Sequence, residues 1–260
     1  MRHILFTLLM TATLTVPTLA QAPTASPTAA STPNPDPATT VNGIVITQGA
    51  LAQRADTEAW LVSREIGGFA GAFYAQNTDA DEMLATIRTV YGVQLAALDD
   101  PERYVTTVLN SMEVDAVLRD IAASEGIVVT DAEVDALIFE HITLAEGLDA
   151  PPDEIAVARF FLAASEATGV DETDIRALFE GRALRAIFYR AVTATREGDT
   201  PTQDDNATFQ AWAFEQIQAA DILRNPDFTA AIPADADYRA RVDEAIADVL
   251  VAGLLPPSTP

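Results

Sequence analysis

Apolar residues recur at intervals of three and four along most of the chain after residue 47. The clearest run carries apolar side chains at Val105, Val108, Leu109, Met112, Val117, Leu118 and Ile121. This spacing places them on one face of an α-helix. A helix of this kind must bury that face, so we predict a mainly α fold built from packed amphipathic helices.

Capping residues, prolines and glycines divide this pattern into separate helices. We expect helices to begin at or just after Thr47, either Thr78 or Asp79, Asp100, Thr130, Pro152, Asp171, Asn206 and Asp237. We expect the first helix to end at Gly67–Gly68 and others to end at Gly126, Gly169 and Gly253. The polar stretch 197–206 is predicted to be a loop.

A short sequence motif occurs twice, as NGIVITQGAL at 42–51 and EGIVVTDAEV at 125–134. Each copy has a glycine, three β-branched residues and a threonine suited to cap a helix. The second copy adds a capping box, with Glu133 three residues after Thr130. We therefore predict two short strands, 41–46 and 126–129, paired with each other within the helical fold.

The first 40 residues differ in composition from the rest. Residues 1–20 have a basic start, an apolar stretch and then small residues suited to a cleavage site. This order is typical of a secretory signal peptide. An uncleaved N-terminal anchor is the alternative. Residues 21–40 are rich in Pro, Thr and Ala and are predicted to be a linker. We expect one folded module over 41–233, followed by a helix and tail over 234–260.

The charge and the absence of cysteine exclude several functions. The formal net charge is −24, and every basic residue other than the two histidines is an arginine. Strong acidity disfavours nucleic acid and anionic lipid as partners, because phosphates would be repelled. Contact with a membrane is expected only through an uncleaved signal segment. Without cysteine the chain has no disulfide, no thiolate nucleophile and no cysteine-ligated zinc.

No residue pattern indicates catalysis, a bound metal or a cofactor. His141 is the only histidine after the signal segment, and its spacing from Leu137 and Ile138 places it on or beside an apolar helix face. We interpret it as a core residue. Paired acidic residues recur at predicted helix starts and in loops, where capping and the helix dipole explain them. We therefore predict that the protein is not an enzyme.

Two sets of apolar residues could contact a partner. The segment GGFAGAFY at 67–74 is either a helix end with a packed loop or a mobile apolar lip, formed by Phe69, Phe73 and Tyr74. A stripe of aromatic residues that includes Phe160 and Trp212 has the spacing of a core, although helix grooves also bind apolar peptides. Our predicted contact residues are Phe69, Phe73, Tyr74, Phe160 and Trp212.

The chain resembles the SurA/PrsA-type chaperones of the bacterial cell envelope, in particular their SurA N-terminal helical module, which is related to trigger factor. The resemblance rests on many weakly matching positions in four segments, VNGIVITQGAL at 41–51, VLNSMEVDAVLRDIAASEGIVVTDAEVDALI at 108–138, GVDETDIRALFEGRALRAIF at 169–188 and FQAWAFEQIQAADI at 209–222. It implies that the C-terminal helix of the module, 206–222, returns to pack on the N-terminal part.

Many members of that family carry a parvulin-type prolyl isomerase domain between the last two segments. Here only residues 197–206 lie in that gap, which is too short for a domain. The resemblance therefore implies an exported chaperone, periplasmic or extracellular, that binds unfolded or nascent secreted polypeptides without catalysis. A degenerate peptidyl-prolyl isomerase and an envelope scaffold with one dedicated partner are the alternatives.

Overall fold

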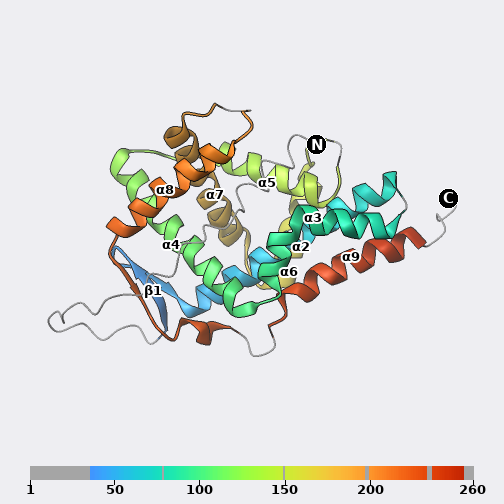
Figure 1. Cartoon of the computed structure of the whole chain (residues 1–260), viewed down its shortest axis with the longest axis horizontal. Coiled ribbons are helices and arrows are strands. Elements are labelled where there is room, and N and C mark those ends of the chain that lie inside the picture. Colours follow the sequence, from blue (N-terminus) through green and yellow to red (C-terminus); the bar gives the residue numbers. More distant parts are fainter. Residues whose placement is uncertain (1–35, 78, 149, 197–198, 233–235, 255–260) are drawn as a thin grey trace. The chain divides into compact units, whose positions relative to one another are not determined.

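The computed structural model describes residues 36–77, 79–148, 150–196, 199–232 and 236–254 (Figure 1). The predicted signal peptide and most of the predicted linker lie outside these residues. The described helices are α2 Gln48–Gln76, α3 Ala80–Leu98, α4 Pro101–Glu125, α5 Asp131–Ala145, α6 Glu154–Thr168, α7 Glu172–Thr193, α8 Gln203–Ala219 and α9 Tyr238–Leu254, with a short 3-10 helix η1 at Phe228–Ala231. Three strands, β1 Pro37–Val41, β2 Ile44–Thr47 and β3 Ile222–Arg224, form one small sheet. The prediction of a mainly α fold is confirmed.

The fold consists of two compact units, each assembled from segments far apart in the sequence. The first unit comprises the chain up to Leu51, with Thr106–Ile127 and Leu184–Ala231. The second comprises Ala52–Val105, Val128–Ala183 and the chain from Ile232 onward. One unit boundary lies between Ala231 and Ile232, and residues 41–231 contribute to both units.

The sheet belongs to the first unit, and its pairing differs from our prediction. Its strand order is β2-β1-β3, with both pairs antiparallel. Asn42 and Gly43 both have positive φ, at 47° and 84°, as the two central residues of a type I′ hairpin turn require. This turn folds β2 back onto β1, so β2 finds its partner locally.

The predicted pairing of 41–46 with 126–129 is therefore wrong. Residues 127–130 form no strand, and the second neighbour of β1 is β3, where Val41 is opposite Ile222. β1 also includes Pro37–Thr40, so the predicted linker 21–40 extends too far. Ala38 and Thr39 in that strand are fully buried.

Helix α4 covers one face of the sheet. Val41 and Ile46 pack there with Ala116 and Val117 of α4, and Ile222 of β3 joins the cluster. These contacts link residues separated by up to about 180 positions, so they depend on the completed tertiary structure.

Most predicted helix ends are confirmed because short-range hydrogen bonds determine them. The Asp79 side chain accepts from the backbone N–H groups of residues 81 and 82, and Thr130 with Glu133 forms the predicted capping box. Gly169 ends α6 in a left-handed conformation, at φ 73°. One helix start differs: α8 begins at Gln203, inside the predicted loop 197–206, where Thr202 caps it.

The prediction that Gly67–Gly68 ends the first helix is wrong, because α2 continues to Gln76. The glycines permit close helix packing instead. A Cβ atom at Gly68 would lie 2.1 Å from the carbonyl oxygen of Leu144 in α5, a distance that no real Cβ tolerates. One at Gly67 would lie 3.3 Å from the Cβ of Ala245 in α9.

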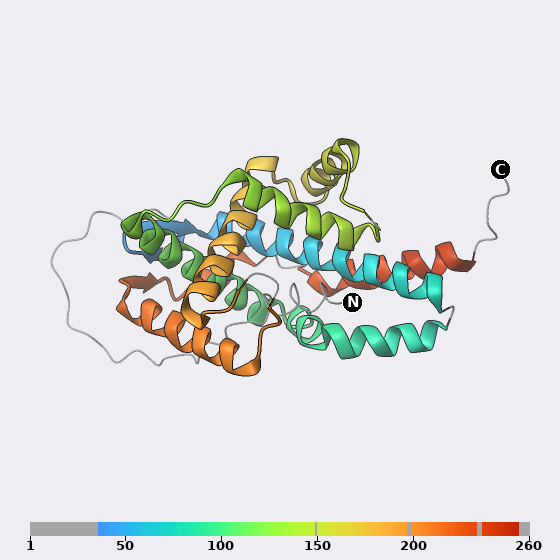
Figure 2. The same ribbon diagram turned by 90° about the horizontal axis from the view of Figure 1, so that it is seen from above.

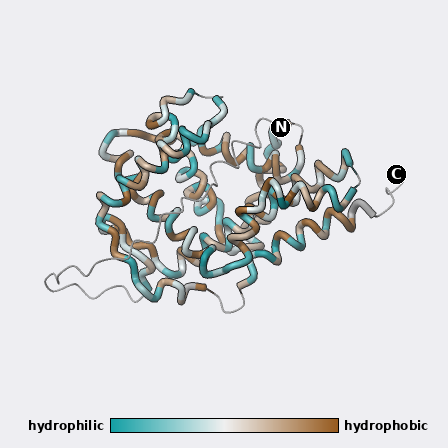
Figure 3. Tube along the Cα trace, viewed as in Figure 1, coloured by the Kyte–Doolittle hydropathy of each residue, from teal (hydrophilic) through white to brown (hydrophobic). Residues whose placement is uncertain are grey.

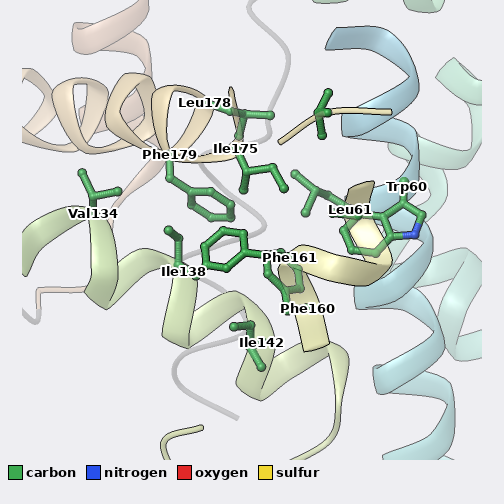
Figure 4. Packing of buried hydrophobic residues seen from close by; sticks show 12 residues of the cluster. Trp60, Leu61, Val134, Ile138, Ile142, Phe160, Phe161, Ile175, Leu178 and Phe179 are labelled. Atoms are coloured by element: carbon green, nitrogen blue, oxygen red, sulfur yellow. The ribbon is translucent and has the colours of Figure 1, made fainter. Parts of the chain in front are cut away.

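The second unit has a large aromatic and aliphatic core (Figure 4). Phe160 and Phe161 of α6 point between Ile138 and Ile142 of α5 and the side chains of α7, and Trp60 and Leu61 of α2 approach from the other side. The rings of Trp60 and Phe160 are 5.4 Å apart. The apolar residues that recur at helical spacing in α5, α6 and α7 therefore pack into one shared core.

Candidate functional site

The strongest candidate for a binding surface is one end of three helices in the second unit. Helices α3 and α9 lie along α2 in both views (Figures 1 and 2). In Figure 2 the last turns of α2 and α9 and the first turns of α3 extend beyond α5 and α6. We call this region, made by residues 67–76, 80–91 and 245–251, the arm end.

Three of the five predicted contact residues lie at the arm end. Phe69, Phe73 and Tyr74 are all half-buried in the last two turns of α2. The ring of Phe69 lies 5.6 Å from that of Tyr91 in α3, edge to face, and 6.3 Å from that of Phe73. The segment is helical throughout rather than a helix end followed by a loop, and the three aromatic residues lie on this one element.

Helix α9 adds aliphatic side chains to the arm end. Val249 and Leu250 are half-buried, and Val251 is 57% exposed. Hydrophobic and hydrophilic residues alternate along this helix (Figure 3), as expected when one face is covered. This contribution was missed from sequence, because an amphipathic pattern does not say which surface a helix covers.

Phe160 and Trp212 do not join this surface. Phe160 is 4% exposed and packs against Trp60, Phe161 and His141, so it is a core residue with no exposed ring for a partner. Trp212 belongs to the first unit. It is half-buried on α8, where its ring stacks on Phe188 at 5.4 Å.

His141 is a core residue, as predicted. It is 1% exposed, and its ring meets those of Phe160 and Phe179 edge to face at 5.7 and 5.8 Å. Neither ring nitrogen has a hydrogen-bond partner in the described structure. Burial, with smaller contributions from the positive charges of Arg182 and Arg64, lowers the pKa of the imidazole from 6.5 to about 3. The ring is therefore neutral at physiological pH.

A second buried titratable group lies in the same unit. Glu65 of α2 is 8% exposed and accepts a hydrogen bond from the Tyr91 hydroxyl at 3.4 Å. Burial raises the pKa of this carboxyl, while Arg182 and the Tyr91 hydrogen bond oppose the rise. The side chain lies on the helix that carries the arm-end aromatics, one turn before Phe69.

The first unit holds two buried carboxylates on α4, each paired with an arginine. Arg185 of α7 donates to Asp115 at 2.8 Å, and Arg224 of β3 forms a bidentate pair with Glu113. The two carboxylate side chains are almost fully buried. The sequence signal was two acidic residues within the apolar run of α4. These pairs join α4 to α7 and to the sheet, a structural role.

The described residues contain no group of three or more His, Asp or Glu side chains that could hold a metal ion. Among the helices of residues 48–254 that the structure describes, none is both long and apolar enough to cross a membrane. A scan against protein-family models matches no family, and searches of curated proteins and of solved structures find no similar protein.

Proposed function

We propose that this protein is an exported chaperone that binds apolar segments of unfolded or partly folded polypeptides at the arm end. The observation that carries the proposal is the gathering of Phe69, Phe73 and Tyr74, all half-buried, on the last turns of one helix. The resemblance to the SurA/PrsA-type chaperones supports the same function.

The proposed mechanism needs neither a cofactor nor a covalent step. Aromatic and aliphatic side chains of a client would be removed from water against the arm end, at about 25 cal/mol per Å² of apolar surface. Large rings give much contact area for little lost conformational freedom. The net charge of −24 would keep copies of the protein apart while the apolar surface stays accessible.

The test is suppression of aggregation, followed by light scattering of a denatured model enzyme on dilution. The F73S/Y74S variant should suppress aggregation less than the wild-type protein, because it removes two partly exposed rings from the arm end. Val128→Ser is the matched control, since Val128 is 76% exposed and lies outside the arm end. Equal suppression by all three proteins would refute the arm end as the site, and no suppression by the wild-type protein would refute the function.

A further inference from the structure

We propose that the second half of α9 can be displaced from α2 and that a client helix takes its place within the arm end. This inference rests on the proposed function and adds the regulation of the site and the class of segment it binds. Three observations carry it: the uneven anchoring of α9, the glycine face of α2 beneath it and the side chains that α9 itself presents to that face.

The anchoring of α9 is concentrated in its first half. Tyr238 and Val242 are almost fully buried, and the Tyr238 ring packs 4.8 Å from that of Tyr104. Within the described part of the chain, the ion pairs that α9 makes outside itself come from Arg239 with Asp99, which follows α3, and from Arg241 with Asp56 of α2. All these contacts precede residue 243.

The second half is less buried over the side chains that the structure describes, which end at residue 251. Among these, Ile246 is the last buried side chain, Val249 and Leu250 are half-buried, and Val251 is mostly exposed. Fewer buried apolar contacts mean a smaller free energy of local opening. Helix α9 should therefore separate from its C-terminal end toward Ala245 while its first turns stay in place.

The surface of α2 that faces the second half of α9 includes two glycines. Gly67 meets Ala245 directly, with 3.3 Å between the Cβ of Ala245 and a Cβ placed at Gly67. At Gly71, one turn further on the same face, an added Cβ would meet nothing within 4 Å. Small residues let helix backbones approach closely, and the open space at Gly71 leaves room for a side chain of an incoming segment.

The side chains of α9 indicate what that segment resembles. Val249 lies four residues after Ala245 and three after Ile246. All three are buried or half-buried, whereas the acidic residues Glu244 and Asp248 are exposed. A competing segment would thus be an amphipathic helix with small aliphatic residues at intervals of three and four, bound in the helix-in-groove mode.

A reversible covalent lock tests the proposal. The chain has no cysteine, so G67C and A245C would be the only thiols. Their Cβ separation of 3.3 Å is just below the usual disulfide range of about 3.5–4.5 Å, so a shift of a few tenths of an ångström lets the bond form. The oxidised double variant would hold α9 on α2, and reduction would release it.

The expected result is that the oxidised G67C/A245C protein loses suppression of a cysteine-free client and that reduction restores it. The single variant A245C, treated with the same oxidant, should keep its activity. Equal suppression by the oxidised and reduced double variant would overturn the proposal and leave the arm end as an open site. If neither the wild-type protein nor the reduced double variant suppressed aggregation, the proposed function itself would be refuted.

A second measurement addresses α9 without an aggregation assay. In the single variant A245C, a synthetic peptide of residues 238–254 should speed thiol alkylation, because it competes with α9 for the same face of α2. The V242C variant, within the anchored half, should react slowly with or without the peptide. An alkylation rate at A245C that the peptide leaves unchanged would also overturn the proposal.

Discussion

Replacing His141 by leucine should stabilise the protein, and the gain should grow as the pH falls. The histidine ring is 1% exposed among Phe160 and Phe179, and both of its nitrogens lack hydrogen-bond partners in the described structure. A buried polar group without a partner costs about 1–3 kcal/mol. Leucine has a similar volume and no polar atom, so His141→Leu should recover about 1–2 kcal/mol near neutral pH.

The pH dependence follows from the pKa of the ring, which is 6.5 in a model compound and about 3 in the fold. Between these values the unfolded chain binds a proton that the native protein excludes, so stability falls as the pH falls. From about pH 7.5 to about pH 5 the single site should cost about 2 kcal/mol. Leucine does not titrate, so the H141L variant should not lose this stability in acid.

Urea unfolding at the two pH values measures both effects. The chain has two tryptophans, and Trp60 lies in the same core as His141. A W212F background would make Trp60 fluorescence a reporter of the second unit. The reasoning is refuted if H141L and its parent lose equal stability between about pH 7.5 and about pH 5.

Glu65 provides a control of opposite sign. Burial raises the pKa of its carboxyl, so the native protein binds a proton more readily than the unfolded chain does. Charged Glu65 therefore destabilises the fold above its pKa, and Glu65→Gln should stabilise it near neutral pH. That gain should shrink as the pH falls toward the pKa that the carboxyl has in the unfolded chain, whereas the gain from H141L should increase. A gain from E65Q that does not shrink in acid would contradict the assignment.

The remaining predictions concern packing and buried charge. Gly68→Ala should destabilise the protein by about 3 kcal/mol or more, because its Cβ would overlap the carbonyl oxygen of Leu144. Gly71→Ala, at an open position of the same helix, should instead add about 0.5–1 kcal/mol, and thermal unfolding of the pair checks both signs. Arg224→Met should cost about 3 kcal/mol, because it leaves the Glu113 carboxylate buried and unpaired. The double variant with Glu113→Gln should recover part of that loss in urea unfolding, and no recovery would contradict the ion-pair account.

Local chemistry made most helix limits predictable from the sequence. Asp79 and Thr130 cap helices through hydrogen bonds that span two or three residues, and Gly169 ends one through its left-handed conformation. Such interactions depend on neighbouring residues alone, so the residue types reveal them. The core position of His141 also followed from helical spacing, because its covered face carries aliphatic residues.

The sequence could not show which surfaces meet. The β-branched triplets at 44–46 and 127–129 look alike, yet the Asn42–Gly43 turn pairs the first with β1, and Val128 in the second is exposed. A short strand has many possible partners of similar propensity, and the topology selects one.

For the candidate site too, the sequence identified some features and tertiary packing decided the others. The sequence alone identified Phe69, Phe73 and Tyr74 as a group, because they share one short segment. It could not separate them from Phe160, since an aromatic residue at helical spacing looks the same whether its ring is covered or not. Tertiary packing decided that Phe160 is core, that Gly68 admits the α5 backbone and that α9 lies on α2. The physical reason is that capping depends on atoms a few residues away, whereas burial depends on which distant helices come together.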